Sequence, residues 1–390
     1  VMTILVMASI AILGLVAYSK LAVSDLPDVN YPTINVTVSY PGASPETMAN
    51  SVALPLEKEF MAIPGISEII STNLLGNTTI ALQFNIDQNI DFAAQDVEAA
   101  ISRAKTNLPR DLPNEPVYRK VNPADTPIIY LALTSTSLEQ SELYKYAFNY
   151  VGQQVARFPG VAEVTVYGSP FAVRIQVDPG SLASKGITLV DVGQAVALSN
   201  PYLPTGQIDG DFISKVINVD GQLVNADEYN PLIVAYKNQG PVRISDVGQA
   251  VNSVQNDRFN IRYIDKEKNQ AAAVVAIQRQ PGANAINVTD AIKNYLPTIL
   301  NELPGSVDLK VIFDRSESIR ESVEEVEFTL FLAFILVVLV IYLYLGQLTE
   351  TIIPSLVLPM SIIATFVVMY WKNYTIDNLS LLAFTLAIGF

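Results

Sequence analysis

Two residue types are missing from the sequence, whose 390 residues include no cysteine and no histidine. Thiol nucleophiles, imidazole bases and the usual zinc ligands are therefore excluded within these residues. Charge is also scarce, because only 16% of the residues are Asp, Glu, Lys or Arg, and the net charge is −14. A chain of this kind has no basic footprint for a nucleic-acid backbone, so we expect no nucleic-acid partner.

Hydrophobic residues are abundant instead, at 50% of the sequence, which indicates a membrane protein. The stretch from Val1 to Tyr18 contains no charged residue and is followed by Lys20. Its length is close to the roughly 20 residues that cross ~30 Å of hydrocarbon. A signal peptide is the alternative, but its apolar core is shorter and ends at a small-residue cleavage site. We expect a retained transmembrane helix at 1–20.

Further uncharged runs lie near the other end of the sequence. We expect transmembrane helices at 326–346 and 352–371, and the start of a fourth, interrupted by the end of the sequence, at 378–390. Only Gly346–Thr351 joins the second and third spans, so these two should form an antiparallel helical hairpin. Buried helices of a soluble protein are the alternative, and the length of the runs argues against it.

Most of the charged residues lie between the first and second spans. This part of the sequence also shows the alternation typical of β-strands, with turn residues at regular intervals. One pattern recurs three times, as an amphipathic helix that ends at or just before Pro-Gly and leads into a strand. The copies are Leu56–Ile66, Val151–Val161 and Ile292–Val307. A helix followed by a strand is half of a split βαβ unit, so we predict several small α+β sandwiches in series outside the membrane.

A second repeat is the hexapeptide Asp-Val-Gly-Gln-Ala-Val, at Asp191–Val196 and again at Asp246–Val251. Because the flanking sequences differ, duplication and coincidence both stay open. Between the copies, Gly206–Gly210 and Asp220–Gln222 are turn signals around the β-rich stretch 211–219. An exposed hairpin arm that reaches a neighbouring subunit is one interpretation, and a solvated loop is the other.

Long motifs at both ends resemble the hydrophobe/amphiphile efflux branch of resistance-nodulation-division transporters. The first motif comprises Leu26–Val36 and Tyr40–Met48, and the second begins at Thr351–Pro354 and ends at Leu386–Phe390. Within that branch, Tyr118–Pro127 is most similar to the AcrB-like pumps of the MdtB/MdtC group. The resemblance covers the whole sequence in order.

This resemblance implies a multi-domain membrane protein, with α-helical transmembrane spans and large α+β periplasmic porter and docking subdomains built from ferredoxin-like βαβ repeats. Porter subdomain 1 would occupy 25–124. Porter subdomain 2 would consist of 125–172 and 263–322, with the docking subdomain inserted at 173–262.

The function that the resemblance implies is proton-driven export of small amphiphilic drugs by a secondary active transporter, with no cofactor and no catalytic site. It places the protein in the bacterial inner membrane, as a homotrimer or heterotrimer with a periplasmic adaptor protein and an outer-membrane channel. In this family a pair of aspartates on the fourth span carries the protons, and we expect them just after Phe390. No proton relay is expected within this sequence, because the uncharged runs contain no Asp, Glu, Lys or Arg. These runs are Val1–Tyr18, Phe328–Leu345, Ile352–Trp371 and Leu379–Phe390.

The resemblance also implies a substrate cleft between the porter subdomains, apolar and aromatic with a few polar groups. Such a site accepts many shapes because the burial of apolar surface is non-directional. In the best-known pumps of the branch, phenylalanine is typical at the positions that match Ile128 and Tyr167. This cleft should therefore be less aromatic on the side of Ile128 and more polar on the side of Tyr167. The residues that would face the cleft are Ile128, Tyr130, Thr165, Tyr167, Asn256 and Phe259; the strand residues among them also fit any half-buried strand.

Other functions stay open. Metal-ion efflux within the same superfamily would need soft ligands, yet Met48 and Met61 are the only methionines away from the spans. A membrane-anchored periplasmic scaffold or receptor would use the spans as anchors only. An enzyme is the poorest fit, because carboxylates such as Asp87, Asp91 and Glu98 are explained by helix capping and solvation.

Overall fold

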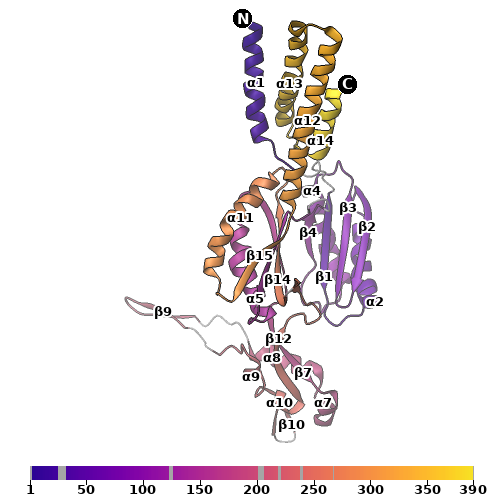
Figure 1. The fold of residues 1–390 in the computed structure, drawn as a ribbon. Helices are drawn as coiled ribbons and strands as arrows, with labels where there is room; N and C mark the ends of the chain where they lie inside the picture. The colour runs from indigo at the N-terminus through magenta and orange to yellow at the C-terminus, as the bar shows by residue number, and fades with distance from the viewer. Residues whose placement is uncertain are drawn as a thin grey trace.

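The computed structural model of the chain describes residues 2–24, 32–122, 126–200, 206–217, 221–237, 240–266 and 268–389. Four helices stand together at one end, two α+β units occupy the middle, and a smaller unit with a protruding arm lies at the far end (Figure 1). Part of the motif Leu26–Val36 and the predicted boundary between residues 124 and 125 lie outside the described residues.

The first α+β unit is an antiparallel sheet in the order β2-β3-β1-β4 with helices on one face. Alternate strand residues, such as Ile34 and Val36 on one strand and Ile80 and Leu82 on another, are fully buried against these helices. In chain order the unit consists of β1 (Thr33–Ser39), α2 (Pro45–Met48), η1 (Ala49–Ala53), α3 (Leu54–Phe60), β2 (Ile66–Leu74), β3 (Asn77–Phe84), α4 (Ile90–Ala104), η2 (Lys105–Asn107) and β4 (Val117–Val121).

The second α+β unit repeats this βαββαβ order. Its strand β14 pairs with β5 on one side, and on the other side with β13 along its first part and β6 along its second; β15 pairs with β5. The unit consists of β5 (Ile129–Ser135), α5 (Gln140–Tyr146), η3 (Ala147–Gly152), α6 (Gln153–Val155), β6 (Val161–Tyr167), β13 (Arg262–Ile264), β14 (Asn269–Arg279), α11 (Ala285–Glu302) and β15 (Val307–Asp314).

The helix-to-strand pattern predicted at three places is confirmed, since α3 leads into β2, α6 into β6 and α11 into β15. The first two Pro-Gly pairs turn the chain through glycine in the left-handed region, with φ of 84° at Gly65 and 88° at Gly160. Only glycine adopts this conformation at little cost, which explains its place after these helices.

The third unit is inserted between β6 and β13. Its first and last strands, β7 and β12, pair antiparallel, so the chain enters and leaves the unit at one place. The unit consists of β7 (Phe171–Val177), α7 (Pro179–Lys185), α8 (Leu189–Ser199), β8 (Gln207–Asp209), β9 (Ser214–Val216), α9 (Ala226–Tyr229), β10 (Ile233–Lys237), β11 (Gly240–Arg243), α10 (Ile244–Val247) and β12 (Gly248–Val254).

The structure settles two questions about this unit. The hexapeptide at Asp191–Val196 lies within helix α8, whereas its copy at Asp246–Val251 passes from α10 into β12, so the repeat is not a duplicated structural unit. The predicted exposed hairpin is present as β8 and β9, with Phe212 at its turn 98% exposed (Figure 1). Gly206–Gly210 is not the turn, because β8 occupies most of it and the chain reverses at 210–213.

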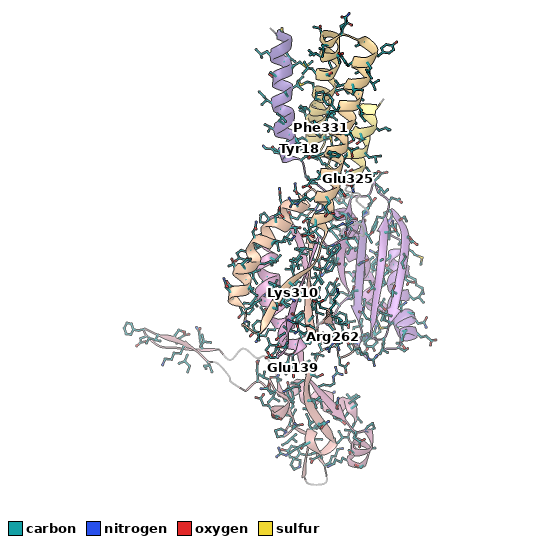
Figure 2. The ribbon with its side chains drawn as sticks, in the orientation of Figure 1. Tyr18, Glu139, Arg262, Lys310, Glu325 and Phe331 are labelled. Carbon is teal, nitrogen blue, oxygen red and sulfur yellow. The ribbon has the colours of Figure 1, made fainter. Side chains whose placement is uncertain are left out.

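The four helices at the other end are α1 (Met2–Lys20), α12 (Arg315–Leu345), α13 (Leu348–Trp371) and α14 (Asn378–Gly389). Among the described residues, α12 and α13 are long and apolar enough to cross a membrane by length and composition, while the apolar stretches Leu5–Lys20 and Asn378–Ala387 are shorter. Helix α12 begins well before the predicted span at 326, and α13 begins four residues before 352. Figure 2 shows Glu325 and Phe331 on α12, on either side of the change from charged to apolar sequence.

The segment Leu21–Ser24 joins these helices to the second α+β unit. The Ile376 amide donates to the Ala22 carbonyl at 2.8 Å, and the Ser24 amide donates to the Ile376 carbonyl at 3.0 Å. The carbonyl of Val23 accepts a bond of 3.2 Å from the Ala285 amide at the start of α11. Val23 also packs against both the core of the second unit and the cluster at the helix ends, as does Val323 of α12.

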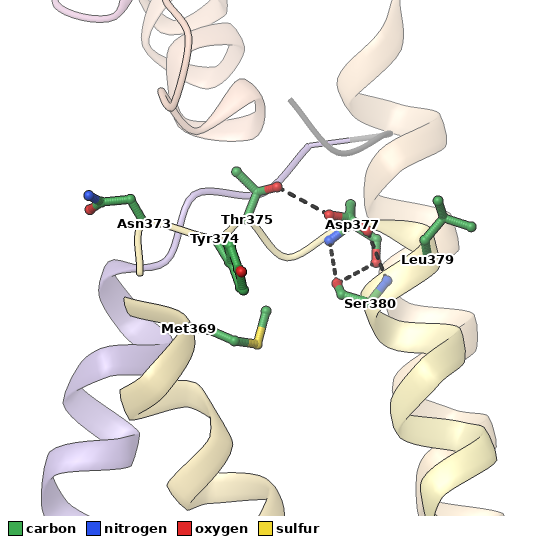
Figure 3. A pocket seen from close by; sticks show the side chains of 7 residues that line it. All are labelled: Met369, Asn373, Tyr374, Thr375, Asp377, Leu379 and Ser380. Atoms are coloured by element: carbon green, nitrogen blue, oxygen red, sulfur yellow. Dashed lines mark hydrogen bonds between the residues drawn. The ribbon is translucent and has the colours of Figure 1, made fainter. Parts of the chain in front are cut away.

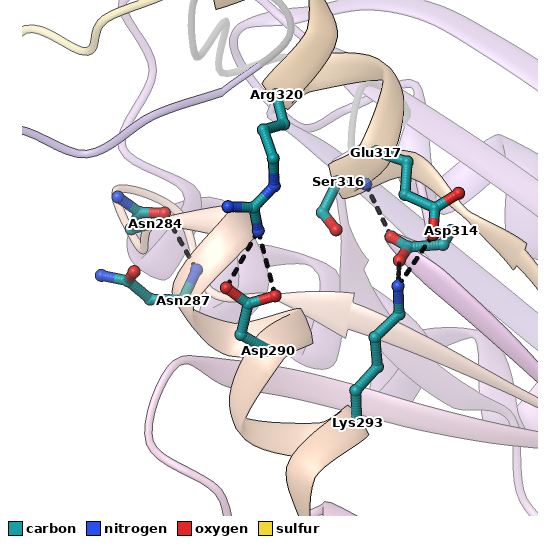
Figure 4. A network of polar contacts seen from close by, with 8 residues as sticks. All are labelled: Asn284, Asn287, Asp290, Lys293, Asp314, Ser316, Glu317 and Arg320. Carbon is teal, nitrogen blue, oxygen red and sulfur yellow. Dashed lines mark hydrogen bonds and ion pairs between the residues drawn. The ribbon is translucent and has the colours of Figure 1, made fainter.

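A second connection between this unit and the helices is ionic (Figure 4). Lys293 of α11 pairs with Asp314, which ends β15, and with Glu317 at 3.0 Å, in the first turn of α12. Asp314 is 4% exposed and accepts from the Ser316 amide at 2.8 Å, so it also caps α12. Burial raises the pKa of Asp314, but the hydrogen bonds from Lys293 and Ser316 outweigh it and hold the pKa below its ordinary value. Asp314 in turn raises the pKa of Lys293.

We expect Lys293→Met to destabilise the protein by roughly 3 kcal/mol at neutral pH, because Asp314 would remain buried without its cation. The folded-state pKa of Asp314 is lowered from 3.8, so the stabilisation is present above that value and is lost as the pH falls through the folded-state pKa. The loss caused by Lys293→Met, measured by thermal unfolding in detergent, should therefore shrink below about pH 4.

The matched control is Glu317→Gln, which removes the 70% exposed partner of the same lysine. It should cost less than about 1 kcal/mol. Equal stability of Lys293→Met and the wild type at neutral pH would show that the buried pair stabilises nothing.

Candidate functional site

Among the described residues, no helix packs on one face of the second unit's sheet. Alternation along β5 turns Ile129, Leu131 and Leu133 toward the core beneath α5 and α11, and the residues between them toward the opposite side. The same alternation holds in β14 and β6. We call this opposite side the helix-free face, and its residues are Tyr130, Ala132, Thr134, Glu163, Thr165, Tyr167, Tyr263, Ala272, Val274, Ala276, Gln278, Asp308, Lys310 and Phe313.

The helix-free face has aromatic rings at its sides and small residues in its middle, and these small residues are almost fully buried: Ala132, Thr134, Ala272 and Ala276. Ala276 of β14 lies opposite Tyr130 on one neighbouring strand and Thr165 on the other. The Tyr130 ring packs edge-on against Phe313 of β15, with centroids 5.9 Å apart. Tyr167 and Phe313 are 41% and 51% exposed, so both rings offer apolar surface to a ligand. Aromatic side chains placed in this way stack on planar amphiphiles and bind their apolar parts.

Three of the six residues predicted to bind substrate lie together on this face. Tyr130 and Thr165 share one row across the sheet, and Tyr167 is in the next row, opposite Val274. Ile128 is only 3% exposed and packs in the core on the helix side, so in this structure it is not on the helix-free face.

The other two predicted residues, Asn256 and Phe259, lie between β12 and β13, where the chain returns from the inserted unit. The main-chain amide of Asn256 donates to Ser169 Oγ at 2.8 Å, close to the end of β6. The Phe259 side chain is 41% exposed. A role of these six residues in binding stays a prediction.

Phe313 was missed by the sequence argument. Regular alternation along β15 would turn it toward the helices with Val307 and Leu309, but the register shifts between Val311 and Phe313 and brings the phenylalanine opposite Tyr130. Nothing in the sequence marks this irregularity. Glu163 was also missed, although the period-two pattern through Thr165 and Tyr167 extends to it.

Charged groups lie at two edges of the face, and each has a partner. At the β6 edge, Glu163 pairs with Arg119 of the first unit at 2.5 Å. On β15, Lys310 (Figure 2) lies 3.4 Å from Asp308. Its Nζ is also 5.3 Å from the centre of the Tyr263 ring, which belongs to β13 on the other side of the sheet, so the Lys310 ammonium extends over the face. Apart from this ammonium, the side chains on the face between Glu163 and β15 are uncharged.

No group of three or more acidic side chains among the described residues is arranged to hold a metal ion. Together with the scarcity of methionine in the body, this finding gives no support to a metal site in that part of the chain.

A separate cavity of about 450 Å³ lies where α13 turns into α14 (Figure 3). Asp377 in its wall accepts from the Ser380 amide at 2.8 Å and from Thr375 Oγ1 at 3.1 Å, which caps α14. These contacts use the carboxylate oxygens for the helix end. We therefore assign the cavity's polar side chains to the joint between the helices rather than to a substrate.

Comparison with known proteins identifies the class of protein to which these sheets, the inserted unit and the apolar helices belong. The chain matches the AcrB/AcrD/AcrF family over residues 1–390 and belongs to this family of resistance-nodulation-division efflux transporters. It is 41% identical over 391 residues to the multidrug resistance protein MdtC of Yersinia pseudotuberculosis serotype O:1b (strain IP 31758) and of Yersinia pestis bv. Antiqua (strain Angola). The alignments cover all of this chain and 38% of each relative.

The position of Tyr167 gives a direct test of the helix-free face. We expect Tyr167→Ala to weaken the binding of an amphiphilic dye about threefold to tenfold, the loss expected for one aromatic contact. Tyr167→Phe keeps the ring and should bind within about twofold of the wild type. Fluorescence polarisation with the purified complete gene product in detergent measures both affinities, and unchanged binding by Tyr167→Ala would remove this ring from the site.

Proposed function

We propose that the chain is the part of a proton-driven multidrug efflux pump that receives amphiphilic compounds on the helix-free face. The observation that carries this proposal is the face itself, with exposed aromatic rings at its sides and small residues between them, in a chain of the AcrB/AcrD/AcrF family. In this assignment, residues 25–124 form porter subdomain 1, residues 125–172 and 263–322 form porter subdomain 2, and residues 173–262 form the docking subdomain.

The proposed location is the bacterial inner membrane, with four spans beginning at residues 1, 326, 352 and 378 and the three globular units in the periplasm. Side chains at the end of α13 support one boundary. Trp371 and Tyr374 are 76% and 62% exposed, and Lys372 lies over the Trp371 ring at 5.1 Å. Aromatic and basic residues of this kind are typical of the interface between hydrocarbon and water.

Transport in this proposal requires partners. The pump would act as a homotrimer or heterotrimer, with a periplasmic adaptor protein and an outer-membrane channel completing the export path. The apolar arm formed by β8 and β9 supports assembly through the third unit, because Ile208, Phe212 and Val216 are all exposed on it.

Coupling would begin with protons at aspartates beyond Phe390 and reach the substrate face through the second unit. Movement of α14 would be passed to Leu21–Ser24 through the hydrogen bonds of Ile376, and from Val23 to the start of α11. The porter subdomains would then alternate between access, binding and extrusion conformations. No cofactor is involved, and the proton gradient supplies the free energy.

Cells that produce the complete gene product and its partners test the energy source, because the outer-membrane channel is in place only there. We expect export of an amphiphilic dye to stop when a protonophore collapses the proton gradient, and to continue when ATP is depleted and the gradient is maintained by respiration. Cells without the protein are the control. Export that persists without a proton gradient would contradict the proposal, and no export under any condition would favour the membrane-anchored scaffold.

A further inference from the structure

Arg119 on β4 lies on the opposite side of its strand from its neighbours. The Tyr118 hydroxyl donates to Glu98 of α4 at 3.2 Å, and Lys120 pairs with Asp91 of the same helix. Because strand residues alternate, Arg119 extends away from α4. Its guanidinium reaches Glu163 of the second unit. This ion pair therefore links the helix-free sides of the two sheets.

Glu163 also belongs to the row of β6 residues predicted to bind substrate. It precedes Thr165 and Tyr167 on the same face, and Thr165 Oγ1 lies 3.5 Å from the Glu163 carboxylate. An amphiphile whose apolar part contacts Tyr167 would have a carboxylate within reach at the edge of the face. A positively charged head group is the natural complement to that carboxylate.

The exposure of the pair decides how readily Arg119 can be displaced. The side chains of Arg119 and Glu163 are 67% and 37% exposed. Exposed pairs of this kind contribute little to stability, so a ligand that replaces the arginine loses little. By contrast, Asp314 in the Lys293 pair is 4% exposed, and breaking such a buried pair costs several kcal/mol. A ligand can therefore displace Arg119 from Glu163 readily, whereas the Lys293–Asp314 pair stays formed and stabilises the fold.

We propose that Glu163 is the residue that selects cationic amphiphiles, with Arg119 as a built-in competitor that holds the carboxylate while the face is empty. A bound cation takes the place of the guanidinium, so the ligand's charge stays paired and the arginine returns to water. Burial of the ligand's apolar part on the aromatic side chains supplies the affinity. This inference rests on the proposed function, because it assigns a specificity to the same site.

The test compares a permanently cationic dye with a neutral dye of similar size, exported from cells by the complete transporter and its partners. The quantity measured is the ratio of the KM for the cationic dye to the KM for the neutral dye. Glu163→Gln should raise this ratio about threefold to fivefold, and Arg119→Ala should lower it about twofold to threefold. The opposite signs separate charge selection from a structural role of the pair, which would move both variants in the same direction.

The control is Glu115→Gln, which removes a carboxylate paired with Lys105 in the first unit at 2.8 Å and 76% exposed. Its ratio should equal that of the wild type. If the wild type exports both dyes but neither Glu163→Gln nor Arg119→Ala changes the ratio, the selectivity proposal is wrong and the proposed function stands. If the wild type exports neither dye although it is folded and assembled, the proposed function fails and this inference fails with it.

Discussion

The structure depends on the short segment Leu21–Ser24, where main-chain hydrogen bonds from the α13–α14 loop and from α11 meet. The C-terminal end of α1, the loop between α13 and α14, and one α+β unit are fixed there by peptide groups rather than by long side chains. Main-chain hydrogen bonds in a buried setting are costly to break, because each lost partner leaves a polar group out of water. Among the described residues, Val23 and Val323 pack against both the hydrophobic core of the second unit and the cluster at the helix ends, so these two clusters meet at this joint.

This arrangement makes the two α+β units unequal. The second unit is tied to the helices by hydrogen bonds, by shared packing and by the Lys293–Asp314 pair. The ion pair between Arg119 and Glu163, which joins the two units, is partly exposed and weak by comparison. Movement of the helices should therefore carry the second unit, and its helix-free face, relative to the first. A substrate site at this boundary would open and close as the units move.

The sequence predicted much of this architecture because its signals are local. Uncharged runs give the apolar helices, and Pro-Gly after an amphipathic helix gives the three helix-to-strand units. Period-two alternation and the resemblance together predicted that Tyr130, Thr165 and Tyr167 lie on one face, and they do. The register shift that turns Phe313 onto that face has no local signal. The contact of Arg119 with Glu163 depends on how two separately folded sheets meet, and the core position of Ile128 depends on packing that alternation does not decide.

Cysteine cross-linking tests the central claim, that the second unit follows the helices and moves against the first, most directly. The chain contains no native cysteine, and paired strand residues such as Val23 and Ile376 are ~5 Å apart, within the range of a disulfide. In a cysteine-free complete transporter, oxidising Val23→Cys with Ile376→Cys should leave transport intact. Bridging Arg119→Cys with Glu163→Cys by a short bis-maleimide should stop transport. Transport that survives the second cross-link and is lost with the first would contradict the account.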